Sequence, residues 1–158
     1  MRHEKEERSL IIIKPDALQR SLVGEIITRF ERKGLAIVGM KMLHLDTALV
    51  EDHYSHIKDK DFFPRIKRFM TSTPVIVMIV QGIGVIDAIR IIVGPTRGFE
   101  AAGGTIRGDY ALSMQSNIVH ASDSKESADA EIARFFKEEE IMDYEKLTTA
   151  IVHSDEMM

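Results

Sequence analysis

The 158-residue chain contains no cysteine and no tryptophan, and it has only four prolines. Without cysteine it can form no disulfide, no thiolate-ligated metal centre and no thiol nucleophile. Aromatic residues make up 6% of the chain, and 21 basic against 25 acidic residues give a net charge of −4. Because nucleic-acid-binding modules use a basic face and exposed aromatic side chains, these values exclude nucleic-acid binding as the expected main function.

Long apolar segments are also missing. The longest uncharged stretch, 71–86, is short and is interrupted by Pro74, Gly82 and Gly84, so it does not suit a membrane span. Residues 1–8 are densely charged and lack the apolar centre of a signal peptide. We therefore expect a cytoplasmic protein with no membrane contact. The length, with no linker or repeat, predicts one domain over 1–158 with its core at about 9–144.

The hydrophobic pattern predicts an α+β fold in which helices pack on one mostly antiparallel, four-stranded sheet. Strands are expected at 9–13, 35–45, 74–80 and 111–119, and helices at 22–33, 48–57, 62–70, 85–93 and 125–137. In 35–45 the more apolar face carries Ala36, Val38, Met40 and Met42, so we expect that face to meet the core. Residues 96–108 contain four glycines and are expected to form a long functional loop.

His120 stands out among the six histidines. It follows an apolar strand and precedes Ser122, Asp123 and Ser124, three residues that favour the N-cap of a helix. The meeting of a strand end and a helix N-terminus is suited to anion chemistry. The local pattern alone is equally consistent with a structural histidine.

Basic residues occur at the ends of neighbouring elements. Lys14 follows the first expected strand, Arg90 precedes a Gly-Pro turn, and Arg107 lies in the glycine-rich loop with the hydroxyl of Thr96. Each one alone is most simply read as surface charge. Together with a candidate nucleophile they suit a polyphosphate, because arginine forks match phosphate oxygens in pairs.

Two other sites have weaker support. Gly82 and Gly84 follow a strand and open a helix, but Asp87 replaces the third glycine of a dinucleotide fingerprint, and the chain has no P-loop motif. His53 and His56 stand three residues apart on an expected helix. They suggest a metal hydrolase as an alternative, although no third ligand is evident.

Six segments taken together resemble nucleoside diphosphate kinases, in the family's order and over about 9–144. They are Lys14-Pro15-Asp16, 22–27, His53-Tyr54, Phe62-Phe63-Pro64, 105–109 and 117–124. The resemblance implies a ferredoxin-like α/β sandwich. It also implies a ping-pong reaction in which a nucleoside triphosphate phosphorylates His120 and the phosphohistidine passes the group to a nucleoside diphosphate, with low base and sugar specificity.

The resemblance also implies a role for each site residue. A neutral imidazole is nucleophilic near pH 7 without a separate base. Glu131 would only orient His120, through the second ring nitrogen, and Ser122 would support Glu131. Phe62 would stack on the nucleotide base, and Met114 would contact its other face. The residues implied to contact the nucleotide are Lys14, Tyr54, Phe62, Arg90, Thr96, Arg107, Met114 and Asn117, of which Lys14 and Asn117 also serve catalysis.

Cofactor and assembly follow from the same resemblance. Mg²⁺ would arrive on the nucleotide phosphates, with no protein ligand of its own. The chain would form a homo-oligomer, either a hexamer or a tetramer built from dimers. Two departures bear on this: Ala121 replaces the usual glycine, and 97–104 has three glycines in place of prolines. If position 121 needs a positive φ, alanine costs about 1–2 kcal/mol there. An impaired family member acting as a binding protein is the alternative, but no key residue is missing.

Overall fold

The computed structural model describes residues 6–152; His3 and His153, and with them both ends of the expected 1–158 domain, lie outside the described residues. One antiparallel sheet has the strand order β2-β3-β1-β4. Its strands are β1 (Glu6–Ile13), β2 (Ala36–Leu43), β3 (Val75–Ile83) and β4 (Val119–Ala121). The predicted four-stranded antiparallel sheet is confirmed.

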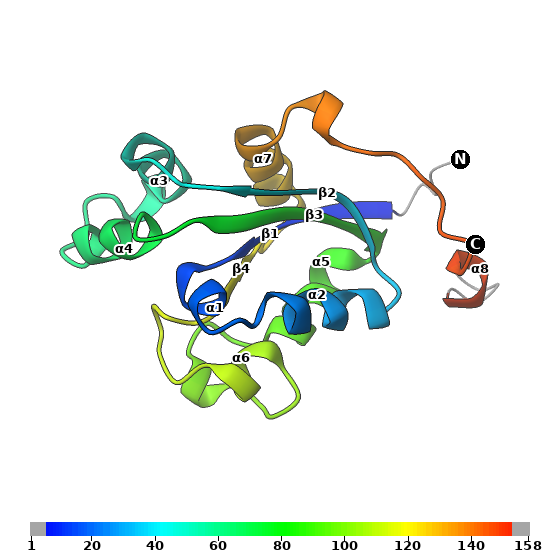
Figure 1. Ribbon diagram of the computed structural model, residues 1–158, viewed down its shortest axis with the longest axis horizontal. Coiled ribbons are helices and arrows are strands. Elements are labelled where there is room, and N and C mark those ends of the chain that lie inside the picture. The colour runs from blue at the N-terminus through cyan, green and yellow to red at the C-terminus, as the bar shows by residue number, and fades with distance from the viewer. Residues whose placement is uncertain (1–5, 153–158) are drawn as a thin grey trace.

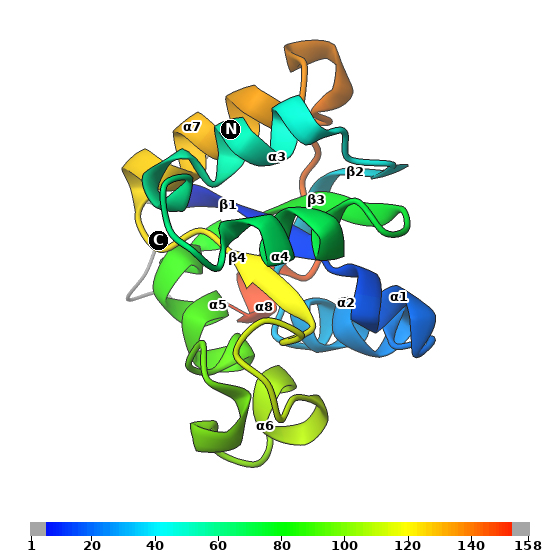
Figure 2. The same cartoon turned by 90° about the vertical axis from the view of Figure 1, so that its left-hand side faces the viewer.

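Helices cover both faces of this sheet (Figure 1). Over one face lie α1 (Pro15–Gln19), α2 (Val23–Arg32), α5 (Val85–Val93) and α6 (Ile106–Tyr110). Over the other face lie α3 (Thr47–His53), α4 (Phe63–Met70) and α7 (Lys125–Phe135). Figure 2 shows the two layers on opposite sides of the strands, with α6 farthest from the sheet. Short 3₁₀ turns occupy Ser55–Ile57, Gly98–Glu100 and Glu138–Glu140.

The alternation of β1 builds two apolar cores. Ile11 and Ile13 pack toward the α2 and α5 layer with Phe30, while Leu10 and Ile12 pack toward the α3, α4 and α7 layer. β3 runs between β1 and β2, and 75–80 is buried on both faces as predicted. A central strand covered on both sides excludes water from its ladder, so this part of the fold gives the site a rigid base.

The predicted faces of β2 are wrong beyond Val38. The ladder with β3 shifts between Ile37 and Gly39, which marks a β-bulge. Because the extra residue reverses the alternation, Val38 is buried while Met40 and Met42 are 54% and 60% exposed. Met40 and Met42 therefore lie exposed on an edge strand and not in the core.

The predicted strand 111–119 is also wrong, because only Val119–Ala121 pairs with β1. Just before it, Ile118 has φ of +76° although it is fully buried. Its carbonyl accepts from the Lys14 N–H at 2.9 Å, and its own N–H donates to Asp16 Oδ2 at 3.0 Å. A β-branched residue is rarely found there, so strain is stored next to His120 and held by these two bonds. Ala121 has no positive φ and is free of the anticipated strain.

Other boundaries differ more modestly. Pro15, expected only to end a strand, occupies the first turn of α1, where its fixed φ is tolerated. The expected loop 96–108 contains the 3₁₀ turn at Gly98–Glu100 and the start of α6.

Beyond residue 141 the chain runs past β2, where Met142 N donates to Val38 O and Tyr144 Oη donates to Ile37 O. The last described element is α8 (Thr149–Val152). Within residues 6–152 no helix has the length and apolar character needed to cross a membrane.

Candidate functional site

A pocket of about 1090 Å³ opens between the α3–α4 pair, the end of α5 and the segment before β4. Ten of the eleven residues expected at the site line it: Lys14, Tyr54, Phe62, Arg90, Thr96, Arg107, Met114, Asn117, His120 and Glu131. The eleventh, Ser122, is fully buried and contacts Glu131. Four of the ten come from α5, α6, β4 and α7, and the other six come from the segments between elements, so distant parts of the chain converge on one cavity.

His120 is held by the sheet and by α7. Its backbone pairs with Ile12 in the β1–β4 ladder. Its Nε2 lies 3.0 Å from Glu131 Oε2, and Glu131 sits on α7, whose N-terminus is capped by the side chain of Ser124. Because Glu131 accepts the Nε2 proton, the neutral ring keeps its free lone pair on Nδ1.

Ser122 extends this contact into the core. Its Oγ accepts from the Leu10 N–H at 3.0 Å and lies 2.6 Å from Glu131 Oε2, against 3.4 Å from Leu10 O. The single hydroxyl proton therefore goes to Glu131, the closer acceptor. Burial alone raises the pKa of Glu131, but the hydrogen bonds from His120 and Ser122 outweigh it and lower the pKa. The carboxylate is anionic and fixed between two donors.

Lys14 and Asn117 form a second linked pair. Lys14 Nζ donates to Asn117 Oδ1 at 2.6 Å, and Asn117 Nδ2 donates to Thr96 O at 2.9 Å. Asn117 is buried, so its amide holds the ammonium in one place. Burial, with repulsion from Arg107, lowers the pKa of Lys14 to about 8. The Lys14 ammonium therefore has too little neighbouring negative charge to stabilise it fully, and a bound anion would stabilise it.

Arg107 is buried and ties three segments together. Its guanidinium donates to Asn117 O at 3.2 Å, Gly94 O at 2.9 Å and Val119 O at 2.7 Å. Burial and the charge of Arg90 lower its pKa to about 10. Three of its five N–H groups serve backbone carbonyls, so two remain for an anion. The sequence predicted only the anion contact.

The mouth of the pocket is partly apolar. Phe62 is 45% and Met114 59% exposed, and both line the opening. Arg65 Nε donates to Gln115 Oε1 at 2.9 Å and links α4 to the segment before β4. Arg65 and Gln115 were missed by sequence reasoning, because residues fifty positions apart carry no local signal of contact. Inside the mouth, burial raises the pKa of Tyr54.

His53 lies against the candidate nucleophile. It is 7% exposed, and its ring meets the His120 ring edge to face with centroids 4.8 Å apart. Both of its ring nitrogens are buried without a hydrogen-bond partner. The alternative metal pair with His56 gains no third ligand, because among the described residues His56 belongs to no cluster of three metal-ligating side chains, and it is exposed on the following 3₁₀ turn. Burial lowers the pKa of His53 to about 3, so this ring is neutral.

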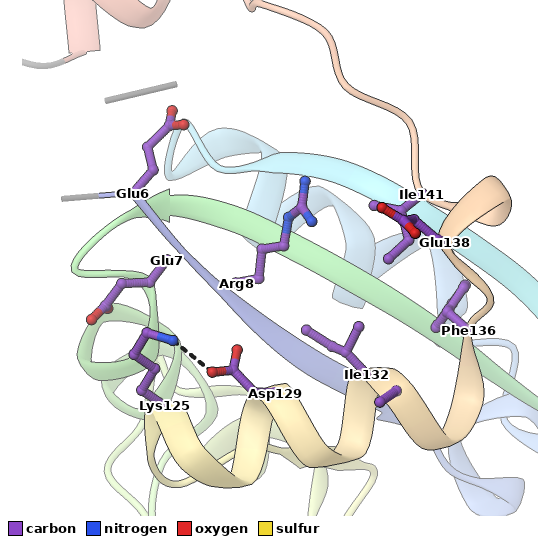
Figure 3. A pocket seen from close by; sticks show the side chains of 10 residues that line it. Glu6, Glu7, Arg8, Lys125, Asp129, Ile132, Phe136, Glu138 and Ile141 are labelled. Carbon is purple, nitrogen blue, oxygen red and sulfur yellow. Dashed lines mark hydrogen bonds and ion pairs between the residues drawn. The ribbon is translucent and has the colours of Figure 1, made fainter. Parts of the chain in front are cut away.

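A second pocket lies on the opposite side of α7, against the start of β1 (Figure 3). There Lys125 and Asp129 form an ion pair at 2.6 Å, and Ile132 and Phe136 supply an apolar wall. Its charged lining is mostly acidic, with Glu6, Glu7, Asp129 and Glu138 against Arg8 and Lys125, whereas Glu131 lines the first pocket. It lacks the converging cations of the first pocket, so it is not the candidate anion site.

Comparison with known proteins identifies the family of the chain. The family model for nucleoside diphosphate kinase matches residues 7–141. A nucleoside diphosphate kinase of Parabacteroides distasonis is 54% identical over 139 residues, which are 88% of this chain and 91% of that protein. The one from Pyrococcus horikoshii is 51% identical, over 87% of this chain and 90% of its own.

Solved structures agree on the fold. A halophilic nucleoside diphosphate kinase from Halobacterium salinarum, in complex with CDP, superposes with a TM-score of 0.92 at 39% identity and covers 94% of this chain and 99% of its own. A family protein from Babesia bovis gives 0.90 at 41% identity, covering 93% and 99%. The ferredoxin-like sandwich is therefore confirmed, and the chain belongs to the nucleoside diphosphate kinase family.

Proposed function

We propose that this enzyme moves the γ-phosphate of a nucleoside triphosphate to a nucleoside diphosphate through a phosphohistidine at His120. One observation carries the proposal: Glu131 accepts the Nε2 proton of His120 at 3.0 Å, which leaves the Nδ1 lone pair in a pocket lined with cations. A nucleophile whose tautomer is fixed in advance loses no energy to reorientation at the moment of attack.

In the first half-reaction, His120 Nδ1 forms a bond to the γ-phosphorus as the bond to the β–γ bridging oxygen breaks. The electron pair leaves with the nucleoside diphosphate. The Nε2 proton stays on the ring, where the anionic Glu131 offsets the new positive charge. A nucleoside diphosphate then takes the phosphoryl group back by the reverse route. Lys14, Arg90 and Arg107 offset charge on the phosphoryl oxygens.

Mg²⁺ fits this site as part of the nucleotide. Among the described lining residues the carboxylates are Asp123 and Glu131, and Glu131 is already engaged by His120 and Ser122. The described pocket residues therefore do not form a cage of carboxylates that could bind Mg²⁺ by themselves. An ion held by phosphates and water suits its preference for retaining waters, and when bound it neutralises phosphate charge.

Low base specificity follows from the apolar mouth. Phe62 and Met114 are half-exposed there, and both present surfaces that contact a flat base without reading its edge. Stacking of this kind tolerates all bases, since every base has a π-face. We propose the same pocket for donor and acceptor nucleotides.

We further propose a homo-oligomer in the cytoplasm, built from single-domain chains. β2 is an edge strand, and Met40 and Met42 are exposed on it. A second copy that covers this edge beyond Val38 would bury both methionines. Met42→Glu should weaken that assembly, which sedimentation at several concentrations measures. Hexamers and tetramers both fit dimers as building blocks.

A two-step label transfer tests the main proposal. The protein is mixed with γ-labelled ATP and magnesium, freed of nucleotide, and examined for acid-labile label on the chain. Unlabelled GDP or CDP is then added. We expect wild type to take up label and discharge it to both acceptors, and His120→Asn to take up none. A folded wild type that binds nucleotide yet stays unlabelled would favour the binding-protein alternative.

A further inference from the structure

The three groups around the nucleophile form a cluster of metal-ligating atoms. One ligand atom from each of His53, His120 and Glu131 lies within 4.8 Å of the other two. All three residues line the nucleotide pocket, so an ion can reach them from solvent and keep an open coordination position. Two imidazoles and one carboxylate make the donor set of many catalytic zinc sites.

His53 supplies the independent sign of a missing ligand. Both of its ring nitrogens are buried without a partner, which is costly for polar atoms and uncommon in folded proteins. A neutral imidazole has a lone pair on one ring nitrogen, which can bind a metal ion. No step of the phosphoryl transfer described above uses this ring.

The geometry needs only a small contraction. Ligand atoms at about 2.0–2.1 Å from a tetrahedral zinc stand roughly 3.3 Å apart. His120 Nε2 and Glu131 Oε2 are already at 3.0 Å, and the most distant pair in the cluster must close by at most about 1.5 Å. Ser122 Oγ donates to the same carboxylate oxygen at 2.6 Å, as outer-shell donors do at metal sites.

We propose that His53, His120 and Glu131 bind a borderline-soft divalent ion of the zinc type, which switches the enzyme off. The ion takes the position of the Nε2 proton between His120 and Glu131. His120 then loses the proton at Nε2 and carries one at Nδ1, so no net proton is released and the Nδ1 lone pair is gone. Mg²⁺ does not substitute, because it prefers oxygen ligands and imidazole suits zinc.

The inhibition rests on the proposed phosphohistidine, but the binding does not, so the two are tested separately. Binding is measured by calorimetric titration of the nucleotide-free protein with Zn²⁺ in excess Mg²⁺. His53→Phe keeps a ring against Tyr54 and Phe135 and removes the ligand atoms. His56→Gln is the matched control, because His56 lies one turn farther on and is exposed.

We expect one zinc per chain in wild type and in His56→Gln, and binding weaker by at least about 100-fold in His53→Phe. Co²⁺ added instead should give the visible absorption of a tetrahedral site in wild type and lose it in His53→Phe. Equal zinc affinity in wild type and His53→Phe, or loss of the site in His56→Gln, would overturn the proposal.

Zinc should also prevent labelling of wild type by γ-labelled ATP, and a chelator should restore it. Labelling that continues with zinc bound would overturn the switch. A chain that takes up no label even without zinc would instead refute the proposed function, while the zinc titration would still decide whether the metal site exists.

Discussion

Ser122 Oγ and His120 Nε2 meet on the same oxygen of Glu131, at 2.6 Å and 3.0 Å. Through Ser122 the contact continues to the backbone N–H of Leu10 in β1. The orientation of the candidate nucleophile is thus set by a chain of hydrogen bonds that begins in the central sheet.

Ser122→Ala should lower kcat by about 10-fold, because Glu131 loses one of the two donors that fix it. It should also reduce the free energy of unfolding by about 1–3 kcal/mol, since the buried Leu10 N–H loses its acceptor. Steady-state kinetics and urea unfolding measure the two effects. In a double-mutant cycle with Glu131→Gln, losses in kcat that simply add would contradict a direct Ser122–Glu131 coupling.

Lys14 should make nucleotide binding depend on pH. Its pKa in the free protein is lowered to about 8, so the ammonium loses its proton as pH rises through that value. A bound phosphate stabilises the charged form and raises the pKa. kcat/KM should therefore fall above pH 8, and binding near that pH should take up a proton.

Calorimetry in buffers of different ionisation enthalpy measures that proton uptake. Lys14→Gln provides the control, because it should show weak binding without the uptake. If the wild type takes up no proton near pH 8, Lys14 does not face the phosphates.

Arg107→Lys should destabilise the fold although the charge is kept. Lysine cannot reproduce a planar fork that donates to Asn117 O, Gly94 O and Val119 O at once. The unsatisfied carbonyls should reduce the free energy of unfolding by about 1–3 kcal/mol. Arg90→Lys, at an exposed position, is the matched comparison and should change stability by less than about 0.5 kcal/mol. Equal stability in both variants would remove the structural function assigned to Arg107.

Ala121→Gly should not improve the enzyme. Ala121, in β4, pairs with Ile11 of β1 and has no positive φ, so a glycine there relieves no backbone strain. The greater freedom of glycine should lower the free energy of unfolding by about 0.5–1 kcal/mol. Urea unfolding and the initial rate of labelling check this. A faster rate or a more stable protein would show that alanine is strained at 121.

Much of the fold could be predicted from the sequence where a pattern is local. The buried run of β3, the apolar stripe of α7 and the glycine after α2 each follow from neighbouring residues. The bulge in β2 and the positive φ of Ile118 could not, because both depend on pairing with distant strands. The same holds for the site: His120 and its basic neighbours could be proposed from motifs, whereas the ring contact of His53 and the carbonyl contacts of Arg107 exist only in the folded chain.

The ring nitrogen of His120 that carries the phosphoryl group shows which tautomer reacts. Glu131 Oε2 lies 3.0 Å from His120 Nε2 and holds the proton on that nitrogen. We therefore expect a phosphoenzyme that is substituted at Nδ1. Phosphorus-coupled NMR of the histidine ring, in protein freshly labelled by ATP and freed of nucleotide, distinguishes the two isomers. Substitution at Nδ1 of His120 would support the tautomer that Glu131 imposes. Substitution at Nε2, or on another residue, would contradict it.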